Sequence, residues 1–272
     1  MLELKNVSYS YPSPTGKQEA IKGVSAVIKG GAVTAVVGRT GSGKTTLTEI
    51  MAGITVPDSG CVLSDGKRIE ECKNKIGTVF QYPEYQLFAQ SVREDIAFGP
   101  MNMGISGDEL DKAVISAAEL TGITDELLEK SPFELSGGQK RMTALAGVLA
   151  MKPQTLILDE PAAGLDPFSR KKVFSIMRNL ADDGMTVVFV THSMEDAAEF
   201  ADEILVLSGG KKQLMGTPHE VFSDRRLDEW GLNIPEIAVV GRLLAEFDLG
   251  DMLTVDEAYD KITALLEEAD KC

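Results

Sequence analysis

A glycine-rich segment near the start of the chain contains the first residues that could bind a phosphate group. Residues 38–45 read Gly-Arg-Thr-Gly-Ser-Gly-Lys-Thr and match the P-loop pattern in full. Glycines let backbone N–H groups turn toward phosphate oxygens, and a helix N-terminus adds positive potential there. Lys44 would contact the β- and γ-phosphates of a nucleotide, and the Thr45 hydroxyl would bind Mg²⁺. The predicted nucleotide-binding residues of this segment are Gly38, Arg39, Thr40, Gly41, Ser42, Gly43, Lys44, Thr45 and Thr46.

Two carboxylates follow an apolar segment later in the chain. Residues 156–160 read Leu-Ile-Leu-Asp-Glu, which predicts a buried strand that ends at Asp159. An aspartate at that position can orient the water shell of Mg²⁺, and Glu160 is placed to polarise an attacking water as a general base. A strand followed by a solvated acidic turn would fit the same letters. The P-loop upstream favours the catalytic interpretation, and the two motifs together predict a nucleoside triphosphatase.

A third motif indicates which family of nucleoside triphosphatases the chain resembles. Residues 135–139, Leu-Ser-Gly-Gly-Gln, precede a predicted helix and resemble the signature sequence of ABC ATPases. The Ser136 side chain and the N–H groups of Gly137 and Gly138 would form an anion site at the helix N-terminus. In that family the site faces the γ-phosphate held by the opposite subunit. The resemblance therefore implies that four residues contact the partner's ATP, namely Ser136, Gly137, Gly138 and Gln139.

Four more residues stand at ABC motifs in the expected order. The resemblance implies that Gln81 contacts Mg²⁺ and water, and that Asp166 lies in a loop that crosses the dimer interface. It also implies that His192 contacts the γ-phosphate and that Tyr11 stacks on adenine. A lone histidine or tyrosine is more often structural, so these two roles depend on their order and spacing within the set.

The ABC resemblance covers about residues 1–216 and implies ATP and Mg²⁺ as cofactors. It implies an ATP sandwich, in which each nucleotide is held between the P-loop of one subunit and the signature sequence of the other. The implied catalytic residues are Glu160, His192, Gln81 and Lys44. The implied metal ligands are Thr45, Gln81 and Asp159.

A narrower resemblance involves residues 80–88 and 92–100. These segments are similar to the ATPases of energy-coupling factor (ECF) transporters, which import vitamins and transition-metal ions, and specifically to the second of two ATPase paralogues. Two residues differ from common patterns: Arg39 stands where members often carry histidine, and Lys140 follows the signature. The resemblance implies a second ATPase subunit as partner, with a heterodimer favoured over a homodimer. It also implies a transmembrane coupling subunit and a substrate-binding membrane subunit.

Composition agrees with an ATPase that is a peripheral membrane protein. No apolar run approaches the roughly 20 residues that span a bilayer, and the N-terminus shows no secretory signal. The formal net charge of −15 repels phosphodiester backbones, which disfavours nucleic acid as a partner. Composition alone predicts a cytosolic protein, and the ECF resemblance implies that it is attached through proteins to the cytoplasmic face of the cell membrane. An ABC ATPase of iron–sulfur cluster biogenesis remains an alternative.

Helices and strands must position these residues, and their order along the chain can be predicted. Because predicted strands and helices alternate, we expect an α/β fold with a mainly parallel sheet. The resemblance adds an N-terminal antiparallel β subdomain and an inserted helical subdomain at about 90–151. We expect an ATPase domain over 1–216 and a small helical C-terminal extension over 217–272. Predicted strands lie near 21–28, 33–37, 61–63, 76–80, 155–158, 187–190 and 204–207, with a hairpin turn at Gly209–Gly210. Predicted helices lie at 45–52, 136–149, 169–182, 193–200, 218–223, 235–247 and 255–269.

Three local patterns make sharper predictions. Residues 11–16 predict a turn after the first strand, since Pro12, Pro14 and Gly16 fall together. Residues 106–109 have capping-box spacing and predict a helix that ends at Gly122. Residues 82–88 add aromatic and apolar side chains directly after Gln81. We expect these side chains either to receive a helix of a membrane partner or to cover the base of the helical subdomain.

Overall fold

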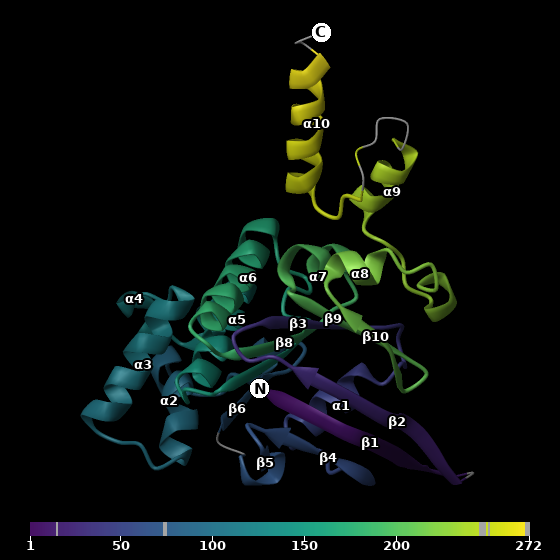
Figure 1. The fold of residues 1–272 in the computed structure, drawn as a ribbon. Helices are drawn as coiled ribbons and strands as arrows, with labels where there is room; N and C mark the ends of the chain where they lie inside the picture. Colours follow the sequence, from purple (N-terminus) through teal and green to yellow (C-terminus); the bar gives the residue numbers. More distant parts are fainter. Residues whose placement is uncertain (15, 73–74, 245–248, 250, 270–272) are drawn as a thin grey trace.

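The computed structural model describes residues 1–14, 16–72, 75–244, 249 and 251–269 of the chain (Figure 1). The strands are β1 (Leu2–Ser13), β2 (Gly16–Ile28), β3 (Val33–Val37), β4 (Ser59–Ser64), β5 (Lys67–Arg68), β6 (Ile76–Val79), β7 (Thr155–Asp159), β8 (Thr186–Val190), β9 (Glu203–Ser208) and β10 (Lys211–Gly216). The α-helices are α1 (Lys44–Met51), α2 (Val92–Asn102), α3 (Asp108–Thr121), α4 (Asp125–Leu128), α5 (Gly137–Leu149), α6 (Pro167–Asp182), α7 (Met194–Phe200), α8 (Pro218–Phe222), α9 (Glu236–Leu243) and α10 (Val255–Ala269). Short 3₁₀ turns are η1 (Ile69–Glu71), η3 (Pro83–Gln86), η4 (Pro132–Glu134) and η5 (Asp228–Trp230).

Within those ranges the strands form two sheets. One is antiparallel, with the order β2-β1-β4-β5, and the other has the order β10-β9-β3-β8-β7-β6. Neighbours in the larger sheet are parallel, except that β10 returns antiparallel to β9. Both Gly209 and Gly210 at this return have positive φ, which a glycine adopts without strain. The predicted α/β fold, the parallel core and this hairpin are confirmed.

Both faces of the larger sheet are covered, as the apolar sequence of β3 predicts. Successive side chains of a strand point to opposite faces, so they enter different clusters. Val36 packs with Leu47 of α1, which lies between the two sheets. Ala35 and Val37 belong to the cluster that contains Phe174 of α6 on the other face. The two layers fix the sheet and hold the loops at its carboxyl edge.

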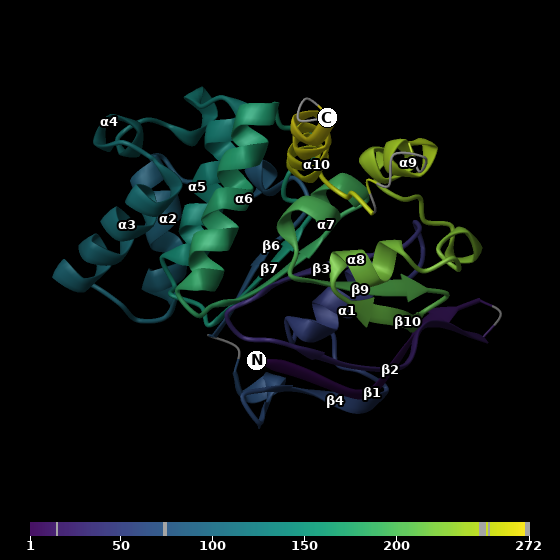
Figure 2. The same ribbon diagram turned by 45° about the horizontal axis from the view of Figure 1, so that its top comes forward.

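The helical subdomain comprises α2, α3, α4 and α5, gathered on one side of the larger sheet (Figure 2). The end of α3 at Gly122, where φ is 69°, confirms the predicted stop. The predicted capping box is wrong, because α3 begins at Asp108 and no side chain caps it. Gly107 occupies the N-cap position with φ 60° and ψ −144°, which places the chain outside the extended conformation that a capping serine needs.

The predicted turn within residues 11–16 is present, but it starts later than predicted, because the two strands continue until Ser13 pairs with Gly16. Tyr11, Pro12 and Ser13 belong to β1, and Tyr11 pairs with Gln18 of β2. The pairing of β1 with β4 stops at Ser8, and beyond it the N–H of Ser10 donates to the Asp58 carboxylate at 2.9 Å instead of to a neighbouring strand. A proline is tolerated on such an edge because no ladder hydrogen bond is lost.

The C-terminal extension begins after β10 and contains α8, η5, α9 and α10. Pro218 is the first residue of α8 and Pro235 the N-cap of α9, as predicted, and the predicted positions 245–247 lie outside the described residues. Phe222 and Trp230 pack into the same core as the large sheet, whereas α10 stands away from it (Figure 1). The boundary at 216/217 stays a prediction. No helix in the described ranges is long and apolar enough to cross a bilayer.

Candidate functional site

The predicted chemical groups meet at the carboxyl edge of the larger sheet. Val36 of β3 and Asp159 of β7 both pair with Val190 of β8, so the loops after these three strands are neighbours. A cavity of about 490 Å³, here called the nucleotide cavity, opens there. Of the predicted residues it is lined by Tyr11, Thr40, Gly41, Gly43, Lys44, Thr45, Thr46, Gln81, Asp159, Glu160 and His192.

The P-loop turns in a way that only glycine allows. Gly43 is the N-cap of α1 with φ 103°, and an added Cβ would come within 2.7 Å of the Ala20 carbonyl oxygen. A Cβ on Gly38 would overlap the carbonyl oxygen of Leu207. Gly38 and the buried Ser42 lie behind the loop rather than in the lining. They shape the backbone that faces the cavity.

Lys44 closes the loop from inside. Its side chain is 6% exposed, and its ammonium donates to the carbonyl oxygens of Gly38 at 2.7 Å and Arg39 at 3.2 Å. Burial lowers the pKa of Lys44, while the negative charges of Glu160 and Asp159 oppose that shift. The cation is thus held by uncharged acceptors that a phosphate group could replace.

Asp159 and Glu160 share one desolvated corner. Burial raises the pKa of Glu160 to about 7, and the charge of Asp159 adds to the increase. Burial also raises the pKa of Asp159, countered by Lys44, His192 and a hydrogen bond from the Thr45 hydroxyl. A carboxyl group with a pKa near neutrality suits a general base.

Backbone geometry aims Glu160 at the cavity. Glu160 has φ 50°, a conformation that non-glycine residues rarely adopt and that often marks a functional site. Its N–H donates to the Val190 carbonyl oxygen at 3.0 Å, which fixes the strained residue to β8. Its Oε1 lies 3.3 Å from Nε2 of His192. Burial lowers the pKa of His192, which favours the neutral imidazole.

Oxygen donors suitable for Mg²⁺ lie at the same edge. The Thr45 and Asp159 side chains line the same cavity, and Thr45 lowers the pKa of the Asp159 carboxyl. Gln81 lines the same cavity. Hydroxyl, carboxylate and amide oxygens are ligands that this hard cation accepts. The residues present therefore fit the predicted metal.

Tyr11 reaches the cavity from the antiparallel sheet. Its hydroxyl lies 3.0 Å from Oγ1 of Thr46, and its ring meets that of Tyr9 edge to face at 5.0 Å. Gln18 and Glu19 of β2 line the cavity beside it, and no motif foretold them. The pairing of Tyr11 with Gln18 would have identified them, had the two strands been predicted to continue up to the turn.

The remaining predicted residues lie elsewhere. Ser136 caps α5 by accepting from the Gln139 N–H at 3.3 Å, and Asp166 caps α6 by accepting from Phe168 and Ser169 at 3.0 Å. We call residues 136–139 and Asp166 the signature surface. None of them lines the nucleotide cavity of its own chain, and Ser136, Gly137, Gln139 and Asp166 are exposed.

Arg39 points in a direction that sequence reasoning missed. Its side chain lies against Gly231, at the end of η5 in the C-terminal extension, instead of lining the nucleotide cavity. Arg141 was missed as well. This buried cation on α5 donates to the carbonyl oxygens of Pro161 at 3.2 Å and Ala163 at 2.6 Å and pairs with Glu84. The only sequence feature that could have indicated a role for Arg141 was its position as a charged residue on the buried face of a predicted helix.

Comparison with known proteins agrees with this geometry. Residues 21–163, more than half of the chain, match the ABC transporter family. The chain is also 42% identical, over 97% of both sequences, to the "Energy-coupling factor transporter ATP-binding protein EcfA2" of Caldanaerobacter subterraneus. It belongs to the ECF transporter ATPases of the ABC family. The predicted family is confirmed, and ATP binding and hydrolysis are its activity.

Solved structures of ABC ATPases share the fold. cbiO1 of Clostridium perfringens, described as part of the ABC transporter complex cbiONQ, is 36% identical with a TM-score of 0.76. The alignment covers 90% of this ECF ATPase and 98% of cbiO1. A dimeric, post-hydrolysis ATP-binding cassette, MJ0796 bound to ADP and Pi, is 28% identical with a TM-score of 0.72. That alignment covers 80% of this chain and 99% of the cassette. None of these relatives points to iron–sulfur cluster assembly.

Proposed function

We propose that this ECF ATPase energises a membrane importer by hydrolysing ATP in sites that two subunits share. One observation supports this proposal above others: the nucleotide cavity and the signature surface are separate within one chain. A residue that stabilises the γ-phosphate must touch it, so residues 136–139 can act only on a nucleotide held by another subunit. The dimeric cassette with ADP and Pi shows that relatives of this fold pair after hydrolysis.

Within each site the residues divide the work. The P-loop backbone, Thr46 and Lys44 bind the phosphates, and Glu160 accepts a proton from the attacking water. His192 beside Glu160 donates to the developing charge. Mg²⁺, when held by Thr45, Asp159 and Gln81, supplies electrostatic stabilisation of the phosphates. Loss of the γ-phosphate removes the shared ligand and lets the subunits separate.

We assign the second subunit to another ABC ATPase and favour a paralogue, as the resemblance implies, over a second copy. The ATPase unit is residues 1–216, and residues 217–272 form an extension. Arg39 lies against Gly231, so the extension touches the P-loop directly. A movement of the P-loop on nucleotide binding would therefore shift the part of the extension that Arg39 contacts.

An aromatic surface after Gln81 is the proposed contact with a transmembrane coupling subunit. The Tyr85 side chain is 85% exposed and Phe88 is 59% exposed, with the Phe88 ring edge to face on that of Phe98 at 4.8 Å. Large exposed aromatics in one place are typical of interfaces. Leu87 beside them is half-buried. Docking there places the ATPase at the cytoplasmic face of the membrane.

The imported compound, a vitamin or a transition-metal ion in this proposal, is selected by a separate substrate-binding membrane subunit. cbiO1 belongs by its description to a complex, cbiONQ, of several components. The ATPase would therefore drive transport by ATP hydrolysis without selecting the transported substrate.

The test compares two exposed positions. Tyr85→Asp should abolish co-purification with membrane proteins while ATP binding and the unfolding temperature stay unchanged. Ile115→Asp on α3, where the native side chain is 41% exposed, is the matched control and should co-purify normally. Normal co-purification of Tyr85→Asp, or equal loss in both variants, would place the contact elsewhere.

A further inference from the structure

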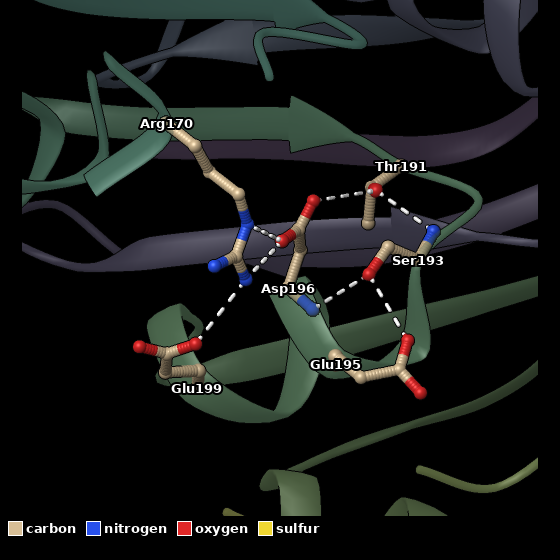
Figure 3. A network of polar contacts seen from close by, with 6 residues as sticks. All are labelled: Arg170, Thr191, Ser193, Glu195, Asp196 and Glu199. Carbon is tan, nitrogen blue, oxygen red and sulfur yellow. Dashed lines mark hydrogen bonds and ion pairs between the residues drawn. The ribbon is translucent and has the colours of Figure 1, made fainter. Parts of the chain in front are cut away.

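The loop that carries His192 is held from both sides by hydroxyl groups (Figure 3). The Thr191 hydroxyl accepts the Ser193 N–H at 3.0 Å and donates to Oδ2 of Asp196 at 3.5 Å. The Ser193 hydroxyl accepts the N–H of Asp196 at 3.0 Å, capping α7. His192 itself makes none of these bonds. Its backbone position is therefore set by its two neighbours and, through them, by Asp196.

Asp196 in turn is fixed by an arginine from another helix. Arg170 of α6 donates from Nε to Oδ1 of Asp196 at 2.6 Å and from Nη2 to Glu199 at 3.2 Å. Its guanidinium also lies 5.6 Å from the ring centre of Phe174 and 5.2 Å from that of Phe200. These contacts leave the guanidinium little freedom, as Figure 3 shows for its polar partners. A planar group so restrained is a firm anchor.

The same arginine is joined to the signature surface. Asp166 is the N-cap of α6, and its carbonyl oxygen accepts the backbone N–H of Arg170 at 2.9 Å. Arg170 thus stands one helical turn beyond the residue expected to face the opposite subunit. A shift of the α6 N-terminus would move the guanidinium with it.

We infer that Arg170 and Asp196 are positioning residues for hydrolysis, which place His192 against the γ-phosphate and tie that placement to the docking of Asp166 on the partner. The inference rests on the proposed role of His192 and extends it to residues that never touch the nucleotide. The physical link is continuous: Asp166, α6, Arg170, Asp196, the hydroxyls of Thr191 and Ser193, and finally His192.

Simple packing of α6 on α7 is the competing explanation, and α6 already provides it elsewhere. Two turns later Arg178 donates to the Phe200 carbonyl oxygen at 3.2 Å and to Asp202 at 3.0 Å, joining α6 to the end of α7. The side chain of Asp196 is only 9% exposed, and burial raises its pKa despite Arg170. A buried charge is costly to keep, and this one lies in the first turn of α7, directly beside the His192 loop.

A double-mutant cycle separates positioning from packing. ATP turnover is measured for the full-length chain with its second ATPase subunit, in Arg170→Met, His192→Ala and the double variant. Arg170→Met should lower kcat about tenfold with KM for ATP within about twofold. In the His192→Ala background the same substitution should have no further effect, because its target is gone.

Arg178→Met is the matched control, with an arginine of similar exposure on the same helix. It should leave kcat within about twofold of the wild type. Equal losses in Arg170→Met and Arg178→Met, or an undiminished effect of Arg170→Met without His192, would overturn the inference. Full activity of His192→Ala alone would instead overturn the proposed role of His192. An impaired His192→Ala beside an unimpaired Arg170→Met would overturn this inference and leave the proposed role of His192 intact.

A second variant guards against misfolding. Asp196→Asn keeps the shape of the side chain and leaves Arg170 paired with Glu199 and stacked on Phe200. It should lower kcat by about threefold to fivefold, again only when His192 is present. A higher KM for ATP with an unchanged kcat would contradict a positioning role.

Discussion

The nucleotide cavity and the signature surface differ in how far their functional side chains are buried. In the cavity, Lys44 is almost fully buried and bonded to loop carbonyls, and Glu160 is desolvated enough to raise its pKa to about 7. On the signature surface, Ser136 and Asp166 are exposed and their oxygens only cap their own helices. The cavity is organised before ATP arrives, whereas the surface has no ligand within its own chain.

This difference teaches how one chain can bind ATP yet need another to hydrolyse it. Groups that must hold a phosphate are preorganised by burial, which costs nothing at the moment of reaction. Groups that must respond to a partner have to remain accessible until it docks. Substitutions on the two regions should therefore separate binding from turnover, and the predictions below proceed from the largest effect to the smallest.

The largest effect is expected inside the cavity. Glu160→Gln should keep ATP affinity but lower kcat by about 10²-fold or more, because the water loses its base. Glu19→Gln removes another carboxylate from the same lining and should leave kcat unchanged. Lys44→Ala should instead weaken nucleotide binding itself, as measured by equilibrium titration. Phosphate release near the wild-type rate from Glu160→Gln would exclude Glu160 as the base.

The signature surface should show the complementary behaviour. Ser136→Arg should bind ATP with unchanged affinity and lose more than about tenfold in kcat, since the added side chain blocks docking on the γ-phosphate. Ser131→Arg is the control, because Ser131 is likewise a helix N-cap, of η4, five residues earlier. If both serines behave alike, the loss comes from capping rather than from the partner's nucleotide.

The pH dependence tests the cavity without mutation. A general base must be ionised, and the raised pKa leaves Glu160 about half ionised near pH 7. Below that pH, kcat/KM should fall about tenfold per pH unit, and above it the profile should level off. Nucleotide binding over the same pH range provides the control for ionisation of ATP. A profile flat down to pH 5 would show that Glu160 is not desolvated in the working enzyme.

The smallest effect is expected at the rim of the cavity. Tyr11→Leu should weaken ATP binding about fivefold with kcat nearly unchanged, because a stacking surface of about 1 kcal/mol is lost. Tyr9→Leu, at the neighbouring ring, should have a smaller effect on affinity since Tyr9 does not line the cavity. An ATP affinity of Tyr11→Leu equal to that of the wild type would argue against base stacking.

The sequence predicted the motifs well because their chemistry is local. A P-loop needs glycines at fixed spacing, and an apolar strand that ends in Asp159 needs little else to place it. Helix stops such as Gly122 are local as well. The roles given to these residues stay predictions until they are measured.

Features that depend on distant contacts escaped prediction. The orientation of Arg39 depends on Gly231, far away in the sequence, and the partners of Arg141 lie in two other segments. The predicted turn began too early, at Tyr11, because nothing local reveals that β1 and β2 stay paired up to Ser13 and Gly16. Register and side-chain direction arise from packing, which a single sequence does not display.

The most direct test of the central claim mixes two inactive chains. Lys44→Ala lacks a working P-loop and Ser136→Arg lacks a working signature surface, so a mixed pair contains one intact composite site. If the chain pairs with itself, the equimolar mixture should recover about a quarter of wild-type ATP turnover, since half of the pairs are mixed and one site in each works. Neither variant alone should exceed background. ATP turnover by the chain as a monomer, at a rate per subunit that is independent of concentration and unaffected by Ser136→Arg, would contradict the account.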